Sequence, residues 1–188
     1  TRKREKTSGD GAAHFSTSPK GVKAGVAAQS YVFTNAFGSD STMLRRLANI
    51  GRNYKNDSGI VQGYTFDTII IPGNCYELED TISRIIRSDL IVGSNNNDVN
   101  TQKGLWKLIV LPTWQAAEGK NPYIIMSSEA NKELRGTVLF DRTVLDVRNW
   151  VDDHTRNLLW NGRARMSCGF NNWRHMILGG ADAGTTLS

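Results

Sequence analysis

The sequence contains few of the residues that build metal centres and disulfide frameworks. Its 188 residues include two cysteines, Cys75 and Cys168, and three histidines, none of them at the spacing of metal ligands. The cysteines are expected to be reduced thiols in the core, typical of a cytosolic setting, with a disulfide as the less favoured alternative. The sequence therefore predicts no metal and no cofactor.

The apolar runs are short, and the motifs of several enzyme classes are missing. No run approaches the about 20 residues that span a membrane, and no signal-peptide pattern opens the chain, so no membrane partner is expected. There is no P-loop, no G-x-G-x-x-G and no G-x-S-x-G. Asp152 and Asp153 beside His154 could supply carboxylates and a base, but a solvated turn explains all three residues. The sequence thus predicts a protein that is not an enzyme.

The composition is that of a foldable soluble chain, with 39% hydrophobic and 22% charged residues, and its length predicts one domain or one domain with an added lobe. Of the net charge of +5, three units belong to the first six residues, where Arg2, Lys3, Arg4 and Lys6 outnumber Glu5. This tail is a candidate for contacts with nucleic-acid phosphates or an acidic neighbour, with a solvated flexible end as the alternative. Because no initiator Met opens the sequence, a processed product or a fragment is expected.

Hydrophobic periodicity predicts a mixed α/β region in the first two thirds of the chain. Leu78, Ile82 and Ile85 form one stripe of a helix, with acidic residues at its start and basic residues at its end. Gly51 is expected to end an earlier helix, with an extension through Lys55 as the alternative. Two apolar runs that stop at prolines predict buried strands. We therefore expect helices at residues 39–50 and 74–88, and strands at 30–34, 66–71, 105–111 and 122–126.

The last third, residues 134–178, predicts a β-hairpin. Within residues 160–170, Ala164, Met166, Cys168 and Phe170 share one face of a strand, which we expect to be buried, whereas Arg163 and Arg165 share the other. A turn at Asn161-Gly162 is one interpretation. A continuous strand with the turn at residues 152–155 is the other, and we favour it because residues 138–148 then have a partner of matching length.

Five tryptophans bring a large apolar surface, and the core explains most of them. Trp173 beside Arg174 follows the long strand and could instead anchor an interface, since this pair of residue types is enriched at binding hot spots. The candidate contacts with other subunits or with nucleic acid are therefore Arg163, Arg165, Trp173 and Arg174.

Several segments follow one another in an informative order. These are Gly59 with Asp67-Thr68-Ile69-Ile70-Ile71-Pro72, the helix at 78–88, the Asn-rich loop at 93–100, the strand at 105–111 and the segment at 160–174. Over about residues 14–180 the chain resembles the major capsid proteins of tailed bacteriophages with the Hong Kong 97-like fold. That family's N-terminal arm, extended loop and spine helix have no counterpart before His14, so the chain resembles the C-terminal part of such a protein or a short form.

This resemblance implies an α+β fold with a mixed α/β axial lobe and a peripheral lobe that contains the hairpin. The implied division is a basic, flexible arm at 1–30, peripheral-domain-like regions at 31–65 and 127–180, an axial-domain-like region at 66–126 and a tail at 181–188.

The resemblance also implies a function. The expected protein is a structural major capsid (head) protein of the virion that forms pentamers and hexamers of an icosahedral shell around the phage genome after assembly in the host cytoplasm. Contacts with packaged double-stranded DNA and with other virion proteins are further expectations. The alternatives are a basic-tailed nucleic-acid-binding module, or the subunit of an encapsulin-like protein compartment.

Overall fold

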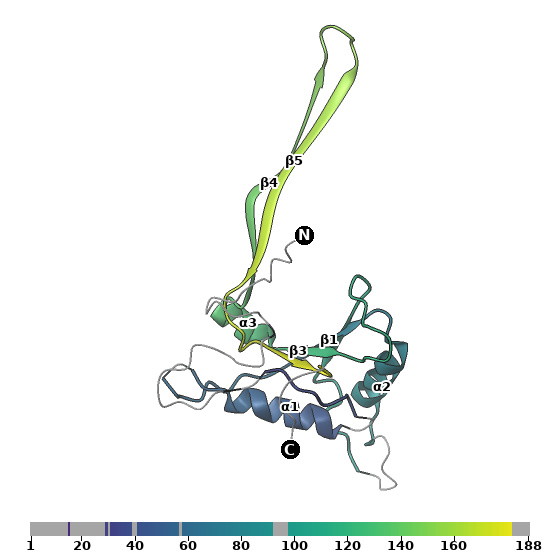
Figure 1. Cartoon of the computed structure of the whole chain (residues 1–188), viewed down its shortest axis with the longest axis vertical. Helices are drawn as coiled ribbons and strands as arrows, with labels where there is room; N and C mark the ends of the chain where they lie inside the picture. Colours follow the sequence, from purple (N-terminus) through teal and green to yellow (C-terminus); the bar gives the residue numbers. More distant parts are fainter. Residues whose placement is uncertain are drawn as a thin grey trace.

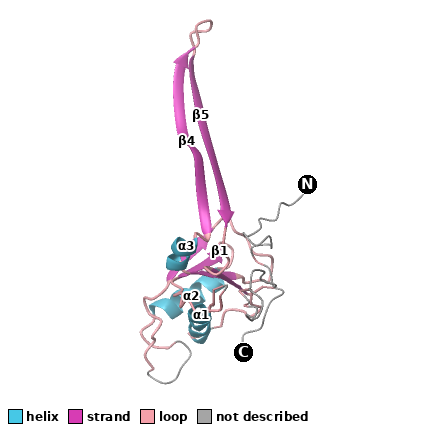
Figure 2. Cartoon of the chain, turned by 90° about the vertical axis from the view of Figure 1, so that its left-hand side faces the viewer, coloured by secondary structure: helices cyan, strands magenta, loops and turns pink. Residues whose placement is uncertain are grey.

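A computed structural model describes residues 15, 29, 31–38, 41–56, 58–91 and 98–181 of the chain. These residues form a body and a long two-stranded hairpin that projects away from it, as Figures 1 and 2 both show. The predicted α+β class is confirmed at this level. The elements are α1 (Thr42–Asn53), β1 (Thr68–Pro72), α2 (Tyr76–Arg87), β2 (Lys107–Leu111), β3 (Tyr123–Met126), α3 (Ser128–Leu134), β4 (Thr137–Val151), β5 (Leu158–Phe170) and β6 (Met176–Gly179).

A four-stranded mixed sheet in the order β2-β1-β3-β6 is the centre of the body. β1 runs parallel to β2, and β3 is antiparallel to both β1 and β6. Ile69, Ile71, Ile125 and Ile177 are fully buried on one face. β6 was not predicted. It lies in the expected peripheral region and pairs with β3 of the expected axial region, so one sheet contains strands of both regions.

The predicted strand at residues 105–111 forms, but the expectation that it is buried is wrong. β2 begins at Lys107 and has one neighbour, β1, so its other edge is open. Its three central residues are only half-buried and Leu111 is exposed. β1 has neighbours on both sides, and four of its five residues are buried. The apolar run alone does not distinguish the central strand from the edge strand.

The short strand expected at residues 30–34 is present only as a bridge beside β6. Val32 pairs with Leu178 in parallel, and two backbone hydrogen bonds of 2.8 Å join Phe33 N–H to the Leu178 carbonyl and Leu178 N–H to the Tyr31 carbonyl. This bridge protects part of the outer edge of β6.

Helix α1 differs from prediction at its end. It continues through Gly51 to Asn53 and stops before Lys55. Gly51 does not end the helix; its small size lets another side chain pack closely against the helix. A Cβ at this buried residue would overlap the ring of Phe66. Met43, Leu44 and Leu47 form the predicted buried stripe. The first two residues of the expected helix, 39 and 40, lie outside the described residues.

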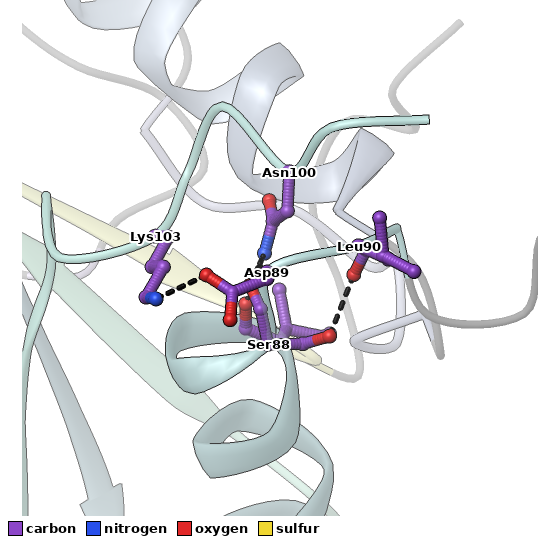
Figure 3. A network of polar contacts seen from close by, with 6 residues as sticks. Ser88, Asp89, Leu90, Asn100 and Lys103 are labelled. Atoms are coloured by element: carbon purple, nitrogen blue, oxygen red, sulfur yellow. Dashed lines mark hydrogen bonds and ion pairs between the residues drawn. The ribbon is translucent and has the colours of Figure 1, made fainter. Parts of the chain in front are cut away.

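Helix α2 matches its prediction, and its C-terminal end is held by a side chain from a distant loop. The Asn100 amide nitrogen donates to the Ile85 carbonyl at 2.6 Å and to the Ser88 carbonyl at 3.0 Å. These are backbone acceptors that a helix leaves unsatisfied at its end. Lys103 forms an ion pair with Asp89 beside them (Figure 3). The segment after α2 is thereby fixed to the helix before the chain enters β2.

Candidate functional site: the projecting hairpin

The projecting hairpin, residues 137–170, is the most unusual feature of the described structure. Its strands β4 and β5 contain 15 and 13 residues and pair only with each other. At a rise of about 3.3 Å per residue, the hairpin extends about 40 Å from the body. Figures 1 and 2 show that, beyond its root beside α3, the hairpin projects away from the helices and from the other sheet.

Polar contacts at its root set the direction of the hairpin. Arg135, which has a left-handed φ of 46°, caps the C-terminal end of α3, and the next residue is the buried Gly136. A Cβ on Gly136 would overlap the imidazole of His175. Thr137 N–H donates to the Asn131 side-chain oxygen at 2.7 Å, and Thr137 Oγ1 lies 2.9 Å from His175 Nε2. The first residue of β4 is therefore fixed to both α3 and the buried chain before β6.

The turn lies at residues 152–157, which contain the residues 152–155 of the favoured interpretation, and Asn161-Gly162 lies within a continuous β5. Asp152 N–H donates to the Asn157 carbonyl at 3.0 Å. The Asp152 carboxylate accepts from Thr155 Oγ1 at 2.6 Å and from His154 N–H at 3.2 Å. These hydrogen bonds, of which the one from the Thr155 hydroxyl has the largest effect, hold the pKa of the Asp152 carboxyl below its ordinary value. The carboxylate thus serves to close the turn.

The strand register confirms the predicted alternation along β5. Paired residues share a face, so the pairs Leu139 with Cys168, Val147 with Gly162 and Val151 with Leu158 lie on one side. Two register shifts in β4, between Asp141 and Asp146, account for its extra length. We call this side the apolar face. Its large apolar side chains are Leu139, Val147, Val151, Leu158, Trp160 and Met166, with Ala164, Cys168 and Phe170 between them. It also carries Asp141 opposite Met166 and Asn149 opposite Trp160.

The expectation that this apolar face is buried is wrong. Trp160 is 67% exposed and Met166 is 65% exposed, because none of the described segments forms a second layer over the hairpin. Cys168 is exposed for the same reason, which corrects the prediction of two core thiols; Cys75 is buried as predicted, and neither cysteine is in a disulfide. An isolated two-stranded hairpin is at best marginally stable in water. A large exposed apolar surface of this kind marks an interaction site.

The opposite face contains the predicted arginines. Arg163 and Arg165 are exposed on it, together with Arg148, whose Nε lies 2.8 Å from the Asp146 carboxylate. This arginine face is less uniform than the sequence indicated, because Phe140 and the opposed pair Trp150 and Leu159 also lie on it. Towards the turn, therefore, both faces of the hairpin are apolar.

The structure places Trp173 and Arg174 inside the body, which corrects their assignment as contact residues. Trp173 stacks on Tyr31 with ring centroids 4.8 Å apart and meets Tyr54 edge-on at 5.6 Å. The Arg174 guanidinium covers the Trp173 ring, and its Nε donates to the Lys55 carbonyl at 3.0 Å. Both residues are more than nine-tenths buried. The contact prediction is therefore kept for Arg163 and Arg165.

Other predicted features are placed as follows. Arg2, Lys3, Arg4 and Lys6 lie outside the described residues. Among the described residues, no cluster of three or more His, Cys, Asp or Glu side chains is arranged to hold a metal ion. Within the same part of the chain, no helix has the length and apolar character needed to cross a membrane. No protein-family model and no curated protein matches this sequence.

Sequence reasoning missed the apolar surface of β4 and of the hairpin near its turn. Leu139, Val147 and Trp150 read as ordinary strand residues, because alternation shows which side chains share a face but not whether anything covers that face. The useful signal was the length of the two matched strands. Strands of 13 and 15 residues exceed the usual 3–10 residues of strands in a compact domain.

Proposed function

We propose that this chain is a structural subunit, a major capsid protein that self-assembles into an icosahedral shell around a phage genome. One observation carries the proposal: the projecting hairpin presents a face of large apolar side chains, interrupted by Asp141 and Asn149, that no part of the described chain covers. A subunit that is stable only when neighbours cover it is suited to assembly. The order of segments that resembles the Hong Kong 97-like capsid proteins supports the same conclusion.

The partner that covers the hairpin is another copy of the chain. Most soluble assemblies consist of identical subunits in closed symmetric arrangements, and a hairpin about 40 Å long reaches well beyond its own body. Each large side chain transferred from water to a packed interface contributes about 1.5–3 kcal/mol before the costs of association. Repetition around five-fold and six-fold centres gives pentamers and hexamers.

The arginine face has a separate part in this proposal. While the apolar face lies against a neighbouring copy, Arg163 and Arg165 contact acidic groups of another subunit or the phosphates of packaged double-stranded DNA. The subunit is not an enzyme; it belongs to the virion, is assembled in the host cytoplasm and meets other virion proteins there.

Negative-stain electron microscopy of the purified chain tests the proposal. The expected result is closed shells, or pentamers and hexamers on the path to them, with DNA inside particles isolated from infected cells. Particles filled with protein cargo would instead identify a protein compartment. Monomers alone, across protein and salt concentrations that favour assembly, would refute self-assembly.

A further inference from the structure

We propose that the tip of the projecting hairpin inserts into an apolar groove on the body of a second copy of this chain. This inference rests on the proposed function and names the surface that receives the hairpin. The hairpin tip consists of Trp150, Val151, Leu158, Leu159 and Trp160, the five large apolar residues that border the turn.

The groove lies over two strands of the central sheet. Ile124 of β3 and Leu178 of β6 are direct partners in the register, so their side chains stand together on one face. Both are half-buried, in contrast to Ile125 and Ile177, which are fully buried on the other face. Half-buried aliphatic side chains side by side form an apolar floor that a partner can cover.

Side chains from the loop before β3, together with Phe15, form the walls of the groove. Trp114, Ala116, Ala117, Lys120 and Pro122 of the loop line it beside the floor, and its volume is about 470 Å³. A second cavity of about 210 Å³ continues it and shares Lys120, Gly180 and Ala181 with it. The volume of the first cavity, about 470 Å³, falls within the range of about 300–1,000 Å³ that is typical of binding pockets.

The hairpin tip carries exposed apolar side chains on both of its faces, which suits it to insertion into a groove. Val151 opposes Leu158 on the apolar face, whereas Trp150 opposes Leu159 on the other face. All five tip residues are at least 40% exposed. A segment that is apolar on both faces loses most contact with water by entering a groove, whereas lying flat on a surface would cover only one face. Tryptophan is also the residue type most enriched at the centres of tight interfaces.

Charge agrees with this orientation. The turn just beyond the tip carries Asp152, the exposed Asp153 and the exposed Arg156, so its two carboxylates outnumber its one guanidinium, and the groove is lined by Lys120. A tip that enters the groove brings Asp153 towards Lys120, and such pairing favours one orientation over others.

The occupant is a second copy because the hairpin does not return to its own body. The tip lies about 40 Å from the root by strand length, and Figures 1 and 2 show the hairpin pointing away from the body in both views. The contact joins two different surfaces, tip to groove, so every subunit both gives a tip and receives one. An interface of this type closes into a ring when the rotation between copies permits it, as five-fold and six-fold assemblies require.

A disulfide between copies tests the contact. In a Cys168→Ser background, which removes the exposed thiol, Trp160→Cys on the tip is combined with Ala117→Cys in the groove. A disulfide forms only when the two Cα atoms lie within about 7 Å. The expected result under mild oxidation is covalent dimers and higher ladders that contain the 160–117 linkage by mass spectrometry. The control combines Trp160→Cys with Arg46→Cys, an exposed position on α1 outside the groove, and is expected to stay uncrosslinked.

A second pair of variants keeps the hairpin intact. Ala117→Arg places a large charged side chain in the groove, and Gln62→Arg adds the same side chain at an exposed loop position outside it. We expect Ala117→Arg to raise the protein concentration needed for assembly at least tenfold and Gln62→Arg to leave it unchanged. Equal cross-linking in test and control, or normal assembly of Ala117→Arg, would overturn the groove assignment while self-assembly still stands. A wild-type chain that never associates would overturn the proposed function itself.

Discussion

The guanidinium of Arg174 lies 4.8 Å from the centroid of the Trp173 ring, and both side chains are buried in the body. The adjacent residues therefore act within one subunit: Trp173 joins Tyr31 and Tyr54 in an aromatic cluster, and Arg174 closes it from one side. The aromatic surface available to partners is instead at the hairpin tip, where Trp160 is 67% exposed.

Replacement of Trp173 should destabilise the folded chain, whereas replacement of Trp160 should leave its stability almost unchanged. Trp173→Ala empties a packed site, and we expect it to lower the free energy of unfolding by about 3–5 kcal/mol. Trp160→Ala removes an exposed side chain and should change the same quantity by no more than about 0.5 kcal/mol. Urea unfolding of the unassembled chain measures both. Equal losses for the two variants would contradict the different burial of the two residues.

Glycine replacements separate the tightly packed body from the open hairpin. A Cβ at Gly179 of β6 would overlap the ring of Tyr123 on the neighbouring strand, so we expect Gly179→Ala to cost about 1–3 kcal/mol through overpacking. Gly162 is the matched control in β5, where a Cβ would lie 3.8 Å from Leu145 Cδ1, an ordinary contact. Thermal unfolding should show a lower midpoint for Gly179→Ala alone, and a wild-type midpoint for that variant would contradict the packing.

Alkaline pH should destabilise the body through its buried tyrosines. Burial raises the pKa of Tyr123 from 10.0 to about 12, and burial is also the main cause of the raised pKa of Tyr54. The unfolded chain therefore loses its phenol protons first, so this contribution to stability is complete below pH 10 and is lost as pH rises through about 12.

The variant Tyr123→Phe should flatten this dependence. The Tyr123 hydroxyl lies 3.3 Å from the Asn35 carbonyl, so loss of that hydrogen bond lowers stability at neutral pH while the slope between pH 10 and pH 12 decreases. Denaturant unfolding at a series of pH values gives both quantities. An unchanged slope in the variant would show that Tyr123 does not carry the effect.

The two thiols should report assembly. Cys168 lies exposed on the apolar face, whereas Cys75 is buried with a pKa raised by that burial. Because the thiolate is the reactive form, we expect a maleimide to modify Cys168 rapidly and Cys75 slowly in the unassembled chain. Assembly covers the apolar face and should slow the modification of Cys168 at least tenfold. Equal rates before and after assembly would place Cys168 outside the interface.

Local sequence signals predicted much of the fold. Stripes such as Leu78, Ile82 and Ile85 specify a helix wherever it packs, and the alternation through Met166 and Cys168 specifies a strand with two faces. A turn at residues 152–155 followed from matching strand lengths, and the observed turn at 152–157 contains it. These features depend on neighbours in sequence, which a pattern records directly.

The features that the sequence did not predict depend on which distant segments pack against each helix or strand. The edge position of β2, the burial of Trp173 and Arg174 and the exposure of Leu139 and Trp160 are set by contacts between distant segments or by their absence. Cys168 shows the difference: the sequence correctly places it on an apolar face, but none of the described residues covers that face. For the candidate site, therefore, the side-chain character of each face could be predicted from the sequence, whereas the exposure of each face could be seen only in the structure.

The most direct test compares assembly when the two faces of the hairpin are altered in the same way. Val147→Gln with Met166→Gln places two glutamines on the apolar face, and Asn161→Gln with Ser167→Gln places two on the arginine face. Light scattering coupled to size-exclusion chromatography measures the mass of each protein across a concentration series. We predict that the wild type and the arginine-face variant form the same large assemblies and that the apolar-face variant remains a monomer. Assembly of the apolar-face variant at wild-type concentrations would contradict the claim that this face joins the subunits.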